Sequence, residues 1–175
     1  MLQKFKVHNF KNFKNDLEID FSDVNGYKFS QDCITNDLIG KMIIYGKNGS
    51  GKTNLGHALC DLKATLGFSS EINTSHPFIS NADSDSDITT FTYTFLFNQK
   101  KDTAVYEYSK SDMLNLVSEK LSVNNHVLYE YHFKENTFIT VDSDYFHNND
   151  IYSIYKNSTN SSLPFLRWCV NNGSV

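Results

Sequence analysis

Residues 46–53 read Gly-Lys-Asn-Gly-Ser-Gly-Lys-Thr and fit the pattern GxxxxGK[ST] at every fixed position. Glycines in this pattern let the backbone curl until successive N–H groups point inward and bind an anion. A short apolar run at residues 42–45 precedes the motif, and a segment with helical spacing follows it. Because a strand before and a helix after are the context that this motif requires, it predicts a loop that holds nucleotide phosphates.

Each part of the motif has an expected role. Lys52 is expected to reach the β- and γ-phosphates, and the Thr53 hydroxyl to ligate Mg²⁺. The helix that begins near Gly51 adds the positive end of its dipole. ATP is favoured over GTP because no downstream N-K-x-D segment is present. The expected nucleotide-binding residues in this stretch are Gly46, Lys47, Asn48, Gly49, Ser50, Gly51, Lys52, Thr53 and Asn54.

Composition limits the class of protein. The chain has 175 residues, enough for one sizeable domain, and a net charge of −4 that gives no general attraction to nucleic acid or to an anionic membrane. Its three cysteines are far apart and form no CxxC pair, which argues against a disulfide framework. The N-terminus lacks the apolar core of a signal peptide, and no apolar run is long enough to span a bilayer. We expect a soluble, cytoplasmic protein.

Hydrophobic periodicity predicts an N-terminal unit over residues 1–67. Phe5 and Val7 alternate with polar residues, as do the apolar residues of 17–21, and the Asn- and Asp-containing stretch between them favours a turn. This predicts an antiparallel hairpin. Residues 42–45 are expected to form a strand. After the loop, a helix is expected with Leu55, Ala58, Leu59, Leu62 and Leu66 on one face and with Gly67 as its end.

The remainder of the chain has a different pattern. Residues 68–90 are rich in Ser, Asp and Asn and predict a loop. Residues 91–141 predict an antiparallel meander of short strands at 91–97, 103–108, 115–121, 127–133 and 137–141. Residues 142–175 are expected to form a loop, which includes 156–162, and then the start of a helix at 163–170 with Pro164 in its first turn. We expect nothing further to pack against that helix, which favours a truncated chain.

With its flanks, the loop resembles a known family. HNFKNF at residues 8–13, a second strand and then the Walker A loop from Gly46 are similar to the N-terminal lobe of ABC-type ATPases of the RecF/SMC group. Within that group the chain resembles bacterial AAA-family ATPases of abortive-infection and anti-phage systems. The resemblance implies an α/β P-loop NTPase lobe, with the meander as its antiparallel β-subdomain. It also implies that Lys11 and Asn12 approach the nucleotide; a hairpin-turn cation is an equal alternative for Lys11.

The resemblance also shows which parts of a hydrolytic site are absent from the sequence. Members of the family use a Walker B Asp and Glu, a signature loop from a second protomer and a switch His. The nearest Walker B candidate, residues 138–143, is interrupted by Thr140 and has Ser143 where a Glu is needed, so it fits better as the last meander strand. The catalytic residues therefore stay unknown. We expect this chain alone to bind ATP weakly and to hydrolyse little of it.

Three functions stay open at this stage. The first is the ATP-binding lobe of an anti-phage ATPase, which pairs with its own C-terminal half, forms a homodimer or larger oligomer, and controls a nuclease or toxin effector. The second is a nucleotide-bound oligomeric scaffold with little turnover. The third is a RecF-type DNA-repair ATPase, which the acidic balance of the chain does not support. A small P-loop kinase is the weakest alternative, because Arg167 is the one arginine in the sequence.

Overall fold

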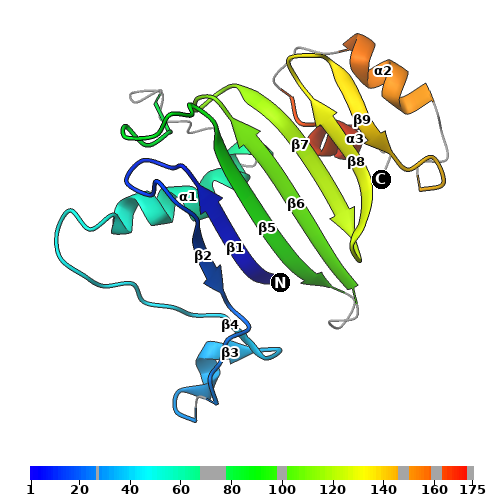
Figure 1. Cartoon of the computed structure of the whole chain (residues 1–175). Coiled ribbons are helices and arrows are strands. Elements are labelled where there is room, and N and C mark those ends of the chain that lie inside the picture. Colours follow the sequence, from blue (N-terminus) through cyan, green and yellow to red (C-terminus); the bar gives the residue numbers. More distant parts are fainter. Residues whose placement is uncertain (27, 68–77, 98–101, 146–149, 159–162, 173–175) are drawn as a thin grey trace.

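An antiparallel sheet of seven strands, in the order β2-β1-β5-β6-β7-β8-β9, is the framework of the chain (Figure 1). The computed structural model describes residues 1–26, 28–67, 78–97, 102–145, 150–158 and 163–172. The strands are β1 (Leu2–His8), β2 (Leu17–Asp20), β5 (Thr89–Phe97), β6 (Asp102–Lys110), β7 (Leu116–Val123), β8 (His126–His132) and β9 (Thr137–Val141). The architecture is mixed α/β and dominated by this sheet.

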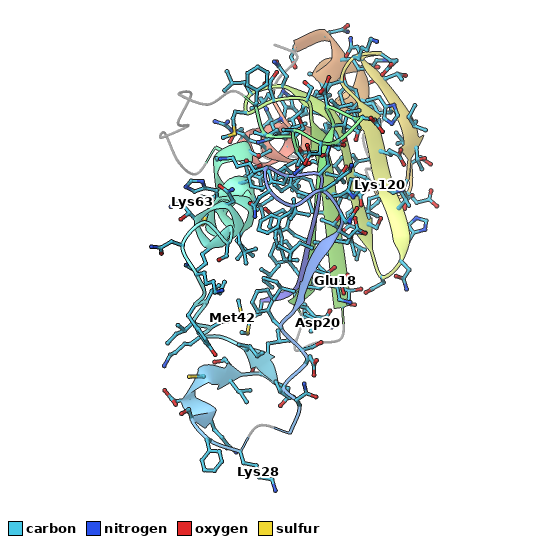
Figure 2. All side chains as sticks on the ribbon, turned by 60° about the vertical axis from the view of Figure 1, so that its left-hand side comes forward. Glu18, Asp20, Lys28, Met42, Lys63 and Lys120 are labelled. Atoms are coloured by element: carbon cyan, nitrogen blue, oxygen red, sulfur yellow. The ribbon has the colours of Figure 1, made fainter. Side chains whose placement is uncertain are left out.

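The two faces of the sheet differ because side chains alternate along each strand. One face is aromatic and buried: Phe91 lies directly opposite Tyr108, and Tyr131 lies on the same face two strands further along the sheet. The other face is polar: Lys120 pairs with Glu130 at 3.1 Å, and Lys4 pairs with Glu18 at 3.0 Å. Figure 2 shows Glu18, Asp20 and Lys120 on the side of the sheet opposite Lys63. The alternation therefore gives one core face and one solvent face.

Three helices cover the aromatic face. Helix α1 (Lys52–Thr65) lies at the β1/β5 end of the sheet, and α2 (Asp150–Ser158) and α3 (Phe165–Asn171) lie at the β8/β9 end (Figure 1). The Tyr93 hydroxyl, on β5, donates to the Ala58 carbonyl of α1 at 2.8 Å. At the other end, the fully buried Glu119 of β7 accepts the backbone N–H groups of Phe165 and Leu166, at 2.6 and 3.0 Å. Buried polar groups thus fix both ends of the helical layer.

The hairpin, the helix and the meander predicted from periodicity are confirmed. Strands β1 and β2 pair antiparallel, and β5 to β9 form consecutive antiparallel pairs. Strands β5, β6 and β7 are longer than predicted, and β5 begins at Thr89, inside the segment predicted as a loop. Helix α1 buries Ala58 and packs the four predicted leucines against the core. The helix ends at Thr65 with Leu66 as its C-cap, and Gly67 follows with a φ of +74°, the left-handed conformation expected just after a helix.

The strand predicted at residues 42–45 is wrong for this structure. These residues belong to no strand, and Figure 1 shows the chain between β4 and α1 passing to one side of the sheet. Ile43 is 89% exposed and Tyr45 is 91% exposed. Apolar, β-branched residues favour a strand, but a strand also needs a neighbour to bond with. None of the described segments forms a backbone hydrogen bond with residues 42–45.

Two predictions for the C-terminal region are also wrong. Residues 150–158, predicted within a loop, form helix α2, which buries Ile151 and Tyr155 one helical turn apart. The expectation that nothing packs against the last helix fails as well, because Phe165 of α3 is fully buried among Tyr129, Phe138 and Tyr155. Pro164 is the N-cap residue of α3 and lies just before its first turn.

Elements between β2 and the loop were not predicted. A 3₁₀ helix, η1 (Gln31–Cys33), leads into the short hairpin of β3 (Ile34–Thr35) and β4 (Leu38–Ile39). Asn36 and Asp37 form its turn with φ of 53° and 55°. These values suit a two-residue hairpin turn, since Asn and Asp tolerate positive φ. The hairpin lies beyond one end of the sheet (Figure 1).

Candidate phosphate-binding site

The loop of residues 46–51 leads directly into the N-terminus of α1. Gly49 and Gly51 have φ of 79° and 93°, a conformation that side-chain-bearing residues rarely adopt. The backbone N–H groups of Gly49, Gly51 and Lys52 donate to no acceptor within the part of the chain that the structure describes. Free N–H groups at a helix N-terminus attract anions, because the helix dipole adds to their own partial charge. The local structure is therefore suited to phosphate.

Asn12 lies against the start of the same helix. Its Oδ1 accepts a hydrogen bond of 2.7 Å from the Asn54 amide. Its Nδ2 is so close to Gly51 that a Cβ built on the glycine would meet it at 2.1 Å. The turn after β1 and the glycine-rich loop, about forty residues apart in sequence, thus meet in one place.

A buried asparagine holds the turn that carries Asn12. Asn9 is fully buried; its Nδ2 donates to the carbonyls of Ser86 and Ile88 at 2.6 and 2.9 Å, and its Oδ1 accepts the Asn81 N–H at 3.1 Å. The Lys11 N–H donates to the Ile79 carbonyl at 2.7 Å. These bonds tie the turn to the chain just before β5. The sequence analysis did not identify Asn9 as an anchor, since its partners are distant in sequence.

Lys52 is bound to its own loop. Its Nζ donates to the carbonyls of Gly46 and Lys47, at 2.8 and 2.7 Å. These bonds bend the loop around the ammonium and place a positive charge beside the free N–H groups. A phosphate that binds the Lys52 ammonium must displace the two carbonyl acceptors. A doubly charged oxyanion can do this, because its charge-assisted hydrogen bonds are stronger than those of a neutral carbonyl.

A cavity of about 440 Å³ lies where these parts meet. Its volume is in the range of small-molecule sites in proteins, although it is open to solvent. Thr53 is exposed at its edge, and its hydroxyl forms no hydrogen bond with a described residue. The structure brings together most of the residues predicted to bind nucleotide. The described residues that line the cavity are Asn12, Asn48, Gly49, Gly51, Lys52, Thr53 and Asn54.

The remaining predicted residues lie around the cavity rather than on its wall. Gly46 and Lys47 supply the carbonyls that hold Lys52, and the Ser50 N–H closes the loop on the Lys47 carbonyl at 3.3 Å. The Lys11 ammonium lies 5.5 Å from the centre of the Phe10 ring, a cation–π arrangement. In this structure Asn12 points into the cavity and Lys11 does not line it.

The weak Walker B candidate lies far from this cavity. Residues 137–141 form β9, which confirms the strand reading of this segment, and β9 is at the opposite edge of the sheet from β1 and β2. Asp142 accepts a hydrogen bond of 2.7 Å from His126, and this contact holds the pKa of Asp142 below its usual range. The Asp142 carboxylate therefore binds His126 of the neighbouring strand and lies away from the proposed phosphate site.

Comparison with models of protein families and with curated protein sequences finds no match to this chain. Within the described residues, every helix is too short or too polar to cross a membrane.

Proposed function

We propose that the chain is the ATP-binding lobe of an ABC-type ATPase of the RecF/SMC group. The observation that carries the proposal is the single cavity in which Asn12 meets the glycine-rich loop and the start of α1. The motif supplies free N–H groups, an ammonium and a hydroxyl, which together suit a polyphosphate with Mg²⁺. Lys52 would hold the β- and γ-phosphates, and Thr53 would ligate the Mg²⁺.

Binding of a non-hydrolysable ATP analogue tests this proposal. Titration calorimetry with Mg²⁺ present should give measurable binding to the chain and a loss of at least about tenfold in Lys52→Ala, since a charge-assisted contact is removed. Lys63→Ala is the matched control, because Lys63 is an exposed lysine on the same helix. Equal affinities of Lys52→Ala and the unaltered chain would refute the assignment.

The metal assignment has its own test. Thr53→Val keeps the shape of the side chain and removes the hydroxyl. The variant should bind the analogue without Mg²⁺ as the unaltered chain does, and it should lose the additional affinity that Mg²⁺ provides. An unchanged response to Mg²⁺ would exclude Thr53 as a ligand.

The proposed partner of this lobe is the C-terminal half of the same ATPase. Residues 42–45, Met-Ile-Ile-Tyr, are apolar and exposed, and their backbone groups bond to none of the described residues. Strands buried on both faces have such continuous apolar runs, typically in parallel sheets. This run would then be a strand of a sheet that the other half of the ATPase completes. Two copies of the completed ATPase would then associate into the homodimer or larger oligomer that the resemblance implies.

The proposed biological role is control of a nuclease or toxin effector in anti-phage defence, by ATP binding or hydrolysis in the cytoplasm. The test is a phage challenge of cells that carry the gene with its neighbours, compared with cells that carry Lys52→Ala. Protection that survives Lys52→Ala would contradict nucleotide control. Protection that needs Lys52, in a complex that turns over little ATP, would favour a nucleotide-bound scaffold.

A further inference from the structure

A second cavity, of about 420 Å³, lies at the opposite end of α1 from the glycine-rich loop. It is formed by the last turns of α1, the connection from β6 to β7, and α3. Asp61 and Lys110 lie in its wall together with Thr65, Met113, Leu114 and Arg167. No part of the proposed ATP site is shared with it.

The wall of this cavity contains a buried ion pair in which one carboxylate oxygen can still accept hydrogen bonds. Asp61 is 7% exposed and Lys110 is 3% exposed, and the Lys110 ammonium donates to Asp61 Oδ2 at 2.8 Å. The hydroxyls of Tyr108 and Thr65 donate to the same oxygen, at 2.8 and 2.9 Å. Asp61 Oδ1 accepts from no described residue. Since carboxylate oxygens accept two bonds each, Oδ1 is the acceptor left for a ligand.

Arg167 provides a charge of the opposite sign. Its guanidinium lies over Gly67, where a built Cβ would meet Cζ at 2.1 Å, and it forms no ion pair or hydrogen bond with a described residue. Two cations and one carboxylate leave the cavity with a local charge of about +1, which favours an anionic ligand. A guanidinium fork matches a carboxylate or phosphate group in two-point contact.

We propose that this cavity binds a small organic acid with a hydrogen-bond donor at its far end. The acidic group pairs with Arg167, the donor reaches Asp61 Oδ1, and the carbon chain lies on Met113 and Leu114. Asp61 lies in the last turns of α1 and Gly67 lies just beyond its end, so the two are separated by about 9 Å at roughly 1.5 Å a residue. The two ends of the ligand are therefore several carbons apart, and an ammonium and a carboxylate on the same carbon atom are too close together.

The probe is 6-aminohexanoate, with hexanoate and hexylamine as matched compounds that lack one end each. In an NMR titration of the 175-residue chain, 6-aminohexanoate should shift the amide signals of residues around Asp61, Lys110 and Arg167. Each matched compound should bind at least about tenfold more weakly, because one charge-assisted contact is missing. Equal binding of all three compounds, or no shift at these residues at millimolar concentration, would overturn the proposal.

Two variants separate this site from a general effect of charge. Arg167→Gln should weaken 6-aminohexanoate at least about tenfold and leave hexylamine unaffected, whereas Lys63→Gln, an exposed charge on α1, should change neither. Lys52→Ala should keep full 6-aminohexanoate binding, so failure of the ATP site and failure of this site are distinguishable. Unchanged binding in Arg167→Gln, with its fold verified by circular dichroism, would refute the assigned contact.

Discussion

Asn12 occupies the space that a side chain on Gly51 would need: the built Cβ would lie 2.1 Å from Asn12 Nδ2. Gly51 also has a φ of 93°, which a residue with a Cβ adopts only under strain. The glycine therefore serves two purposes, the turn of the loop and the approach of the asparagine. The contact ties the shape of the loop to the hairpin turn after β1.

Gly51→Ala is expected to destabilise the fold by roughly 1–3 kcal/mol, because both the backbone and Asn12 must move. It should also reduce affinity for the ATP analogue. Gly56 provides the matched control, since it lies inside α1 with nothing within 4 Å of its built Cβ. Gly56→Ala should raise stability by roughly 0.5–1 kcal/mol. Urea unfolding measures both, and a stable Gly51→Ala would contradict the close packing.

Asn12→Asp should change stability and nucleotide affinity in opposite directions. A carboxylate at the N-terminus of α1 interacts favourably with the helix dipole, by roughly 0.3–1 kcal/mol, and can still accept the Asn54 hydrogen bond. The same charge repels phosphate in the cavity. Thermal unfolding and calorimetric titration of one preparation check both effects.

The control for Asn12→Asp is Asn25→Asp, which adds the same charge at an exposed position before the β3–β4 hairpin. It should change neither the stability nor the affinity for the ATP analogue much, since screened surface charges contribute little. If Asn12→Asp kept full affinity for the analogue, Asn12 would have no role at the phosphates.

Local patterns predicted the elements whose formation depends on near neighbours in the chain. The alternation around Phe5 and the helical spacing from Leu55 to Leu66 each place apolar side chains on one face, and in the structure that face packs in the core. The position of Asn12 was also predicted: the resemblance implied that Asn12 lies near the glycine-rich loop, and the structure places it there. Here the sequence and the geometry agree because short-range preference and burial favour the same structure.

The failures have a common cause, which is dependence on distant partners. Residues 42–45 have strand-forming side chains but no hydrogen-bonded partner strand within the described fold, and Ile43 is left exposed. Helix α2 contains Ile and Tyr residues that favour strands, and its helical form depends on the contact of Tyr155 with Tyr131 and Phe165. The Asn9 anchor and the Asp61–Lys110 pair also join distant residues. None of these contacts has a local signal.

Lys110→Met should destabilise the protein by about 3–5 kcal/mol, because it leaves the Asp61 carboxylate buried without its partner charge. The pair is 3% and 6% exposed at its side chains. Lys41→Met removes the equivalent charge from the Lys41–Asp32 pair, whose side chains are 67% and 72% exposed. That variant should cost no more than about 1 kcal/mol. Equal losses in urea unfolding would show that burial of the Asp61 pair has no energetic consequence.

Cys169 and Cys60 should differ sharply in reactivity. Burial raises the pKa of the Cys169 thiol to about 12, with a smaller contribution from the Glu119 carboxylate, whereas Cys60 is exposed on α1. The thiolate is the reactive form, so a raised pKa means less thiolate at any working pH. At about pH 8 a disulfide reagent should label Cys60 rapidly and Cys169 only slowly, if peptide mass spectrometry follows each site.

Two controls make the cysteine experiment decisive. Cys60→Ser should remove the rapidly labelled Cys60 peptide and leave the slow reaction of Cys169 unchanged, with the partly buried Cys33 followed as a separate peptide. Unfolding in urea should bring Cys169 to the rate of an ordinary thiol, because desolvation is the main cause of its raised pKa. Fast labelling of Cys169 in the folded protein would mean that α3 opens readily. The contacts that Glu119 makes with Phe165 and Leu166 argue for the slow result, since they hold the start of that helix against the sheet.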